Sequence, residues 1–322
     1  MAELSEKELR QDGNAVNKKK ATRDSYGEAL RDLADRYPDL VVLDADVAEA
    51  TKTAIFRKAY PDRHFDCGIQ EANMMGVAAG LAAAGKIPFV SSFAMFAAGR
   101  AYEIIRNSVG YPHLNVKIGA THAGISVGED GATHQCCEDI ALMRTVPGMT
   151  VIVPSDDIEA KAAVEAAILH KGPVYLRFGR LPVSIFNDSS YKFEIGKGVL
   201  LRDGTDITVI ACGILVPQAM AAAEELSGKV SVRVINMPTV KPVDEEIILK
   251  AARETGEIIT LEEHSVIGGL GDAVAAVTSE KCPVRVKKLG VNDVFGHSGP
   301  GDVLLKEFDL TKEGIVKLIV NR

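Results

Sequence analysis

The chain has 322 residues, of which 47% are hydrophobic and 25% are charged, and its formal net charge is −7. This length predicts two domains, and the composition is typical of a folded globular protein rather than a disordered chain. The five cysteines form no C-x-x-C pair and there is no basic excess, which argues against a disulfide framework, a paired-thiolate zinc site and a nucleic-acid partner.

The N-terminal segment is polar and carries the run Lys18-Lys19-Lys20. It contains no apolar stretch typical of a signal peptide, and no segment of the chain reaches the roughly 18 apolar residues that a membrane-spanning helix needs. We therefore expect a cytoplasmic protein that does not contact a membrane.

From about residue 24 the sequence alternates helical and strand patterns, which is typical of a parallel sheet covered by helices. The first helix carries an apolar stripe made by Leu30, Leu33, Ala34 and Tyr37. We expect helices near 71–84, 97–108 and 157–170. The expected buried strands are 40–46, 87–92, 115–120, 150–154 and 173–178.

The stretch from Phe186 to Gly198 lacks a helical period and is rich in Asn, Asp, Ser and Gly, so we place the inter-domain linker at 187–198. Alternation then restarts, which predicts a second, smaller α/β domain. Its expected strands are 207–213, 230–237, 257–263 and 283–289, with helices near 215–227, 244–254 and 270–280.

The segment Thr121–Gln135 is the richest in groups that can do chemistry. It holds two histidines, two acids and several glycines, with few core-forming side chains. Asp130 precedes His134 by four residues, and such an acid can tune an imidazole for proton transfer near neutral pH. The composition alone favours a binding loop and a solvated glycine-rich loop about equally.

Glu71 stands at the start of the alanine-rich helix EANMMGVAAGLAAAG. An acid in the first turn of a helix is stabilised by the helix dipole, and this structural role needs no further function. However, a helix that is apolar on all sides is expected to be buried, and a carboxylate desolvated at its start suits acid–base chemistry.

Two aromatic rings and three arginines complete the candidate residues. Phe93 and Phe96 are three residues apart, which favours one shared side, and the ordinary explanation is core packing. Arginines at strand or helix ends suit an anion, although a surface salt bridge is the more common role. These arginines are Arg23 before the first helix, and Arg177 and Arg180 after the strand at 173–178.

Six segments, in this order, resemble the C-terminal half of transketolase, and the resemblance covers nearly everything after the first 20 residues. It implies an α/β fold of two doubly wound domains: a pyrimidine-binding domain that holds thiamine diphosphate at 20–186, and a smaller transketolase C-terminal domain at 199–322. GEDGATHQ is the most specific piece. The segments are KATR (20–23), DADVAEAT (44–51), GIQEANM (68–74), SSFAMF (91–96), THAGISVGEDGATHQ (121–135) and YLRFGRLP (175–182).

The resemblance implies a thiamine diphosphate cofactor and transfer of a two-carbon ketol unit from a ketose phosphate to an aldose phosphate. Glu71 would bond the aminopyrimidine ring and drive its imino form. Phe96 would stack on that ring, with Phe93 and Asp46 beside the cofactor.

The same resemblance implies the substrate contacts. His122 and His134 would contact the reacting oxygens, and Asp130 would contact a sugar hydroxyl. Because guanidinium groups bind phosphate strongly, arginines would hold the substrate phosphate. The implied phosphate ligands are Arg23 and either Arg177 or Arg180.

The sequence also departs from the family pattern. Full-length members hold the diphosphate through a divalent metal with a Gly-Asp-Gly motif and a later Asn, and this motif is absent here. We therefore expect a separate N-terminal subunit that supplies the metal site, for Mg or Ca, and a heterotetramer. Gln70 and Ala72-Asn73 replace the usual Arg and His around the glutamate, and Ala50-Thr51 replaces a substrate-channel serine, so the sugar preference stays open.

Three alternatives stay open beside this interpretation. One is the beta subunit of the decarboxylating component of a 2-oxo acid dehydrogenase, against which GEDGATHQ argues. Another is the C-terminal half of deoxyxylulose-phosphate synthase, which would use the same glutamate and phenylalanine. The third, from a different class, is a non-catalytic partner subunit. Retention of Glu71, His122, Asp130 and His134 argues against a non-catalytic chain.

Overall fold

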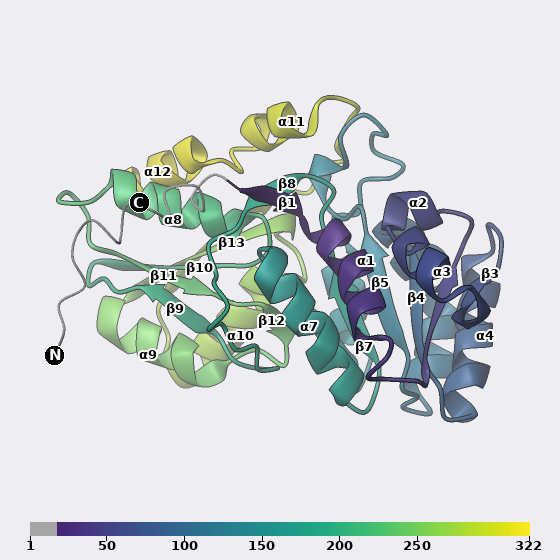
Figure 1. Ribbon diagram of the computed structural model, residues 1–322. Helices are drawn as coiled ribbons and strands as arrows, with labels where there is room; N and C mark the ends of the chain where they lie inside the picture. Colours follow the sequence, from purple (N-terminus) through teal and green to yellow (C-terminus); the bar gives the residue numbers. More distant parts are fainter. Residues whose placement is uncertain (1–17) are drawn as a thin grey trace, which may run out of the picture.

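Two α/β units lie side by side in the computed structural model, which describes residues 18–322 (Figure 1). Residues 1–17, the segment that suggested the absence of a signal peptide, lie outside the described residues. The first unit has a seven-stranded sheet of order β12-β6-β7-β5-β4-β2-β3, parallel except for β12. Its strands are β2 (Leu40–Asp44), β3 (His64–Asp66), β4 (Ile87–Phe93), β5 (Lys117–Thr121), β6 (Thr150–Ile152), β7 (Val174–Arg177) and β12 (Thr239–Lys241).

Helices cover both faces of this sheet, because successive strand residues point to opposite sides. In β2, Val42 packs in the cluster with α1 and α7, whereas Val41 and Leu43 pack in the cluster with α4. The helices are α1 (Thr22–Leu33), α2 (Ala48–Thr51), α3 (Ala54–Ala59), α4 (Glu71–Ala83), α5 (Tyr102–Ile104), α6 (Asp139–Thr145) and α7 (Asp157–Leu169).

The helix α4 is not covered on all sides within this chain, so the expectation that it is wholly buried is wrong. Met74 and Met75 are fully buried against the sheet, whereas Val77 is 40% exposed. Gly76 and Gly80 lie on the same exposed side. The reason is that α4 forms an outer layer, so only its inward side meets the sheet.

The segment predicted as a helix at 97–108 is helical but irregular. Two π-helical turns, η2 (Met95–Arg100) and η3 (Ile105–Gly110), flank α5. A π-helical turn holds more residues than an α-helical turn and occurs frequently at functional sites. Hydrophobic periodicity does not distinguish the two forms, which explains why the sequence did not reveal the irregularity.

The second unit has a five-stranded sheet of order β14-β13-β10-β11-β9, in which only β9 is antiparallel to its neighbour. Helices again lie on both faces, and the two doubly wound units confirm the predicted fold class. The strands are β9 (Val199–Arg202), β10 (Ile207–Ala211), β11 (Val232–Asn236), β13 (Glu257–Ser265) and β14 (Arg285–Val291). The helices are α8 (Leu215–Glu225), α9 (Glu245–Thr255), α10 (Leu270–Lys281), α11 (Gly301–Glu307) and α12 (Lys312–Val320).

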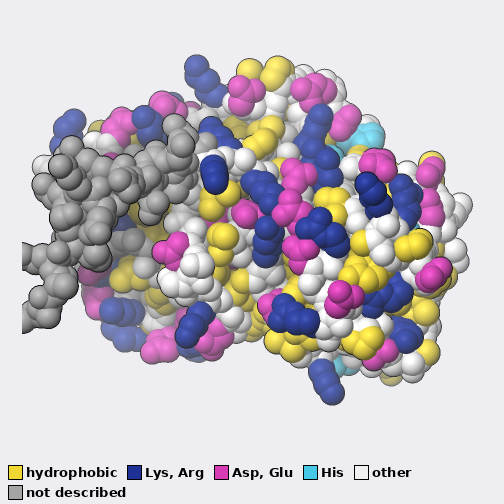
Figure 2. Space-filling model, viewed as in Figure 1, with side chains coloured by type: hydrophobic (Ala, Val, Ile, Leu, Met, Phe, Trp, Pro, Cys, Tyr) yellow, Lys and Arg dark blue, Asp and Glu magenta, His cyan; other side chains and the backbone are white. Residues whose placement is uncertain are grey.

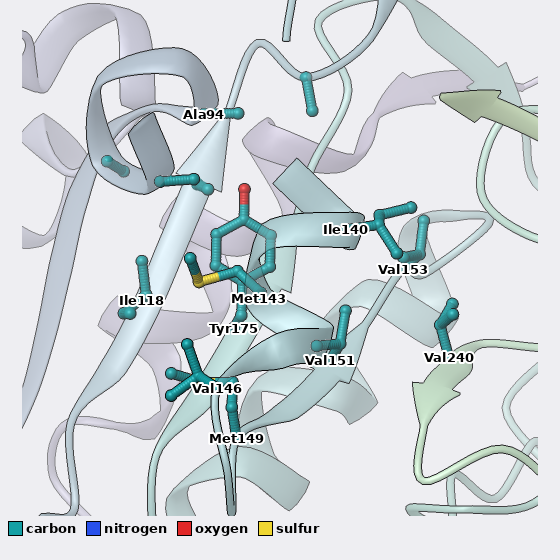
Figure 3. Packing of buried hydrophobic residues seen from close by; sticks show 14 of the residues in the cluster. Ala94, Ile118, Ile140, Met143, Val146, Met149, Val151, Val153, Tyr175 and Val240 are labelled. Atoms are coloured by element: carbon teal, nitrogen blue, oxygen red, sulfur yellow. The ribbon is translucent and has the colours of Figure 1, made fainter. Parts of the chain in front are cut away.

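The strand β12 joins the two units, since it comes from the second half of the chain and pairs antiparallel with β6 of the first sheet. Val240 is buried in the same core cluster as Val153 and Ile140 (Figure 3). Lys241 Nζ donates to the carbonyls of Arg144 and Val146 at 2.8 and 2.6 Å. The predicted bounds, 20–186 and 199–322, place β12 in the second domain. They did not anticipate that this strand is part of the first sheet.

Within the first unit, β1 (Lys19–Ala21) and β8 (Pro182–Ser184) form a separate antiparallel pair, which brings the two ends of this unit together. Next to it, Lys20 and Lys161 form ion pairs with Glu28 and Asp157 at 2.5–3.3 Å. Figure 2 shows basic and acidic side chains interspersed over the middle of this face. Within residues 18–322, no helix combines the length and the apolar character needed to cross a bilayer.

Candidate active site

The candidate site follows from the parallel register of the first sheet, because parallel strands bring their carboxyl ends to one edge. Phe93 at the end of β4 is paired with Thr121 at the end of β5. His122 comes directly after Thr121, and its ring stacks on Phe93 with a centroid distance of 3.9 Å and an interplanar angle of 30°. Residues predicted from distant segments thus meet at this edge.

Two further rings extend this contact into an aromatic group. The Phe96 ring on η2 lies 6.3 Å from the Phe93 ring, nearly parallel to it. His134, from the far end of the glycine-rich loop, meets Phe96 edge-on at 5.2 Å. Phe93 and Phe96 are both only partly buried, so the group keeps accessible ring surface.

Glu71 lies beside this aromatic group, in the first turn of α4, and is 2% exposed. Its carboxylate accepts a hydrogen bond from Ser92 Oγ at 3.2 Å and pairs with Arg100 Nη1 at 3.0 Å. The Arg100 guanidinium in turn lies 4.8 Å from the Phe96 ring centroid. Arg100 was missed from the sequence, although it follows Phe96 by four residues and this spacing places two side chains on one side of a helix.

A cavity of about 620 Å³ opens next to these groups. Its walls combine two phenylalanines, one guanidinium and part of the glycine-rich loop, which suits a planar ligand with polar edges. The lining residues are Met95, Phe96, Arg100, Ala132, Thr133, Glu138 and Phe295.

His122 is held as a neutral imidazole. Arg23 Nη1 lies 2.8 Å from its Nε2, and a guanidinium can only donate, so Nε2 accepts and the ring proton is on Nδ1. Nδ1 lies 2.9 Å from Thr121 Oγ1, to which it donates. Burial lowers the pKa of His122 to about 3, and the nearby charges of Arg23 and Arg180 add to this effect.

The backbone of His122 is also strained. Its φ of 55° lies in the left-handed region, which costs a non-glycine residue about 1–2 kcal/mol. Such strain persists only where the surrounding structure fixes the conformation, and it is concentrated at functional sites. Asp46 shares this feature with a φ of 60°, and its exposed side chain lies just beyond the end of β2.

Two of the three predicted arginines share a second pocket of about 260 Å³, whose lining includes Arg23 and Arg180. Arg180 Nη1 pairs with Glu129 Oε2 at 3.0 Å and lies 3.6 Å from Asp130 Oδ2. Arg23 Nε is buried and has no hydrogen-bond partner among residues 18–322. This pocket therefore offers two guanidinium groups to an anion.

Arg177 does not belong to this pocket rim, which corrects the expectation that it binds a substrate phosphate. Its side chain is 5% exposed, and its Nε forms an ion pair with Asp139 Oδ2 at 2.8 Å. Its Nη2 donates to the carbonyls of Cys136 and Glu263 at 3.2 and 2.9 Å. The Nε and Nη2 groups are thus engaged inside the protein, away from the pocket that Arg23 and Arg180 share.

The Asp44 carboxylate at this edge has a structural role. Asp44, at the end of β2, accepts hydrogen bonds from the Val47 backbone and from the hydroxyls of Thr51 and Thr53 at 2.6–3.0 Å. Burial raises its pKa. Within residues 18–322, no group of three or more His, Cys, Asp or Glu side chains is arranged to hold a metal ion.

Comparison with known proteins gives matches along most of the chain. Residues 18–184 match the model described as transketolase, pyrimidine binding domain, and residues 196–315 match transketolase, C-terminal domain. The chain is 52% identical over 305 residues to a protein of Methanocaldococcus jannaschii named as a transketolase C-terminal section, covering 94% of this chain and 96% of that protein.

Two further relatives have similar coverage. A 6-deoxy-6-sulfo-D-fructose transketolase subunit of a Clostridium species is 45% identical over 92% of both chains. A solved structure described as a split gene transketolase, in an inactive β4 tetramer, is 50% identical. It superposes with a TM-score of 0.86 over 94% of this chain and 97% of that chain.

The neutral state of His122 leads to a prediction. We expect its imidazole to stay neutral, with the proton on Nδ1, between about pH 5 and pH 8, where an ordinary histidine titrates. Arg23→Met should raise the pKa of His122, because a neighbouring positive charge is removed. Nitrogen-15 NMR of the histidine side chains measures both the position of the ring proton and the pKa. The His122→Asn variant assigns the signal.

Arg31→Met is the control for this experiment, since Arg31 lies on the same helix but pairs with Asp32 at the surface. This variant should leave the His122 signal unchanged. A wild-type His122 that titrates at its ordinary value would contradict the assigned hydrogen bonds.

Proposed function

Because this chain belongs to the transketolase family, we propose that it is the C-terminal subunit of a two-subunit transketolase. In this proposal it transfers a two-carbon ketol unit from a ketose phosphate to an aldose phosphate, with thiamine diphosphate as cofactor. It is active only together with an N-terminal subunit that supplies the diphosphate-binding domain and its divalent metal, Mg or Ca. The assembly proposed is a heterotetramer.

One observation carries the proposal: the groups needed for cofactor and substrate form a continuous set along one edge of the first sheet. Glu71 contacts Arg100, which lies over Phe96. The aromatic contacts continue through Phe93 to His122, and from there to the guanidinium of Arg23. A chain that had lost its function would have no reason to keep this set together.

The residues present fit the pyrimidine half of thiamine diphosphate. The accessible face of Phe96 offers a stacking surface for a planar ring, and the buried Glu71 carboxylate offers a proton acceptor beside it. The cofactor, when bound, supplies the carbanion chemistry that breaks and forms carbon–carbon bonds. Glu71 would hold a proton at its carboxylate oxygen, and Phe93 and Asp46 would line the cofactor.

His122 and His134 flank the space next to these rings and would bind oxygens of the reacting sugar. His122 is neutral, so its Nε2 becomes an acceptor for a sugar hydroxyl if Arg23 turns to a substrate anion. Asp130, at the exposed turn of the same loop, would accept a hydrogen bond from a second hydroxyl.

Arg23 and Arg180 would bind the terminal phosphate of the sugar, since their guanidinium groups line one pocket. Glu129 and Asp130 hold Arg180 at the pocket rim. The same pair of guanidiniums suits a sulfonate as well, and one relative is named for a 6-sulfonated ketose. The identity of the terminal anion is therefore a question for the assay.

The first test is reconstitution with the N-terminal subunit. We expect the purified chain alone to show no turnover, because its sequence lacks the Gly-Asp-Gly motif that holds the diphosphate and metal in full-length members, and the mixture with its partner to transfer a ketol unit to an aldose phosphate. A coupled assay with ketose phosphate and a 6-sulfonated ketose as donors measures this. Decarboxylation of pyruvate or branched-chain oxo acids without ketol transfer would instead indicate the dehydrogenase subunit.

Glu71 gives a sharper test in the reconstituted complex. Glu71→Gln keeps the shape of the side chain but cannot hold the proton, so exchange of the thiazolium proton should slow by about 10²–10⁴-fold. NMR after acid quench measures the exchange. The control is Glu165→Gln, which alters a glutamate on α7 that pairs with Arg36. If Glu71 serves only the helix dipole, exchange would stay normal and stability would fall by about 0.3–1 kcal/mol.

The two arginines at the end of β7 should behave differently. Arg180→Met should raise the KM for phosphorylated ketoses about 10–150-fold, the loss of one charge-assisted hydrogen bond, with little effect on unphosphorylated ones. Arg177→Met breaks a buried ion pair and should instead lower the free energy of unfolding by about 3–5 kcal/mol without changing the ratio of the two KM values.

Two measurements distinguish these outcomes: the KM values for phosphorylated and unphosphorylated ketoses, and the free energy of unfolding from urea titration. Equal losses of activity toward phosphorylated and unphosphorylated sugars in Arg180→Met would contradict a phosphate-binding role.

A further inference from the structure

We infer that the C-terminal domain shapes the active-site loop, and that Glu263 is the positioning residue through which it acts. This role deepens the proposed function and rests on it for its catalytic consequence. The loop in question, Thr121–Gln135, belongs to the first domain and carries His122 and His134. Glu263 belongs to β13 of the second sheet.

Three glycines of the loop meet the C-terminal domain in a left-handed conformation. Gly124 has a φ of +84°, and a Cβ there would lie 2.4 Å from the Glu263 carboxylate. At Gly128 (φ +86°) a Cβ would lie 3.2 Å from the Gly299 carbonyl, and at Gly131 (φ +74°) 2.5 Å from Ser298 Oγ. The glycines therefore allow both the turn of the loop and its close approach to the other domain.

Glu263 makes the strongest of these contacts. Its side chain is 4% exposed, and Oε1 accepts a hydrogen bond from the Ser126 backbone N–H at 2.6 Å. Its own carbonyl accepts from Arg177 Nη2 at 2.9 Å. A carboxylate bonded to a backbone N–H is a charge-assisted contact, which is shorter and stronger than a neutral one.

The second contact region is the segment before α11. Gln135 Nε2 donates to the Ile125 carbonyl inside the loop and to the His297 carbonyl of the C-terminal domain, at 3.1 and 3.0 Å. Helix α11 packs against the short turn Ile125–Val127 of the loop, and Figure 1 shows α11 next to the connection that follows β5. The C-terminal domain thus holds the loop in its first half, at Ser126, and at its end, at Gln135.

This anchoring explains how His122 keeps its strained backbone. Gly124 and Ser126 lie two and four residues after His122, so fixing this short segment on Glu263 also fixes the turn that orients the imidazole against Phe93. Glu263 makes no hydrogen bond to the imidazole within residues 18–322, since its carboxylate accepts from the Ser126 backbone and packs close to Gly124. It is therefore a positioning residue and acts through the loop.

The neighbouring Glu262 is a matched control. It is also fully buried, but its carboxylate accepts from the Leu270 and Gly271 backbone N–H groups at 2.7 and 2.8 Å, inside the C-terminal domain. Glu262→Gln and Glu263→Gln therefore make the same chemical change at adjacent buried sites. Only the second touches the active-site loop.

The first experiment is hydrogen exchange of the full chain without cofactor. Glu263→Gln should speed exchange of the amides at 124–128 about tenfold or more, the effect of losing roughly 1.4 kcal/mol of local stability. Glu262→Gln should leave these amides unchanged and speed exchange at 270–273 instead. Equal effects of both variants on the loop, or an unchanged loop in Glu263→Gln, would overturn the inference.

The second experiment uses the complex reconstituted with the N-terminal subunit. Glu263→Gln should lower kcat/KM for the ketose about 10–100-fold while the KM for thiamine diphosphate stays unchanged, because the loop meets the sugar rather than the diphosphate. Glu262→Gln should keep wild-type kinetics. A loss of cofactor binding in Glu263→Gln would contradict a role in the loop.

Two further outcomes are distinguishable. If Glu263→Gln does not fold, Gly124→Ala tests the same contact from the loop side, because its methyl group would collide with the carboxylate. Normal loop exchange in Gly124→Ala would overturn the inference. If the wild-type complex has no transketolase activity, the proposed function fails, while hydrogen exchange still decides whether Glu263 holds the loop.

Discussion

The buried ion pair between Arg177 and Asp139 is the interaction on which the two domains and the active-site loop depend. It links the end of β7 to the start of α6, and the same guanidinium donates to the carbonyls of Cys136, just after the loop, and of Glu263 in the second domain. Tyr175 Oη also donates to Asp139 at 2.8 Å. A buried charge that loses its partner costs several kcal/mol, so separating any of these segments from the guanidinium is unfavourable.

This rigidity allows the sheet edge to hold unfavourable backbone conformations. Asp46, Lys52 and His122 all have positive φ and all follow strands or a short helix at the carboxyl edge. At Lys52 the conformation is fixed by close packing, because a Cβ on Gly27 would lie 2.3 Å from the Lys52 carbonyl. Strain of this kind needs a scaffold that over-determines it, and the parallel sheet with its inter-domain ties supplies that scaffold.

Much of the fold could be predicted because its signals are local. Buried strands such as 87–92 and 257–263 are short apolar runs, and the structure contains β4 and β13 at these positions. The two α/β units follow from the alternation of such runs with helices. The strand β12 could not be predicted in the same way, because its three residues pair with a strand about 90 positions earlier in the chain.

The candidate site was predictable to the extent that it resembles a known motif. The sequence indicated Glu71, Phe96, His122 and His134, but it could not distinguish Arg177 from Arg180. Both follow one strand, and only the fold shows that Arg177 is buried while Arg180 lines a pocket. Arg100 escaped notice although its spacing of four residues from Phe96 favours contact on a helix, because an arginine in an alanine-rich segment carries no signal of a partner such as Glu71 from a distant helix.

Glu262 and Glu263 show how one strand serves both domains. Successive side chains of a strand point to opposite faces, so Glu262 points toward the start of α10, whereas Glu263 points toward the loop of the first domain. Burial raises the pKa of Glu262 to about 7, although the helix N–H groups oppose this shift.

This alternation has a structural consequence. If β13 were shifted by one residue in the sheet, its side chains would point to the opposite faces. Glu262 would then face the loop of the first domain, and Glu263 would face the helix. The register that builds the C-terminal sheet therefore also sets the geometry of the active-site loop. The C-terminal domain consequently acts on the active site through the same hydrogen bonds that stabilise its own fold.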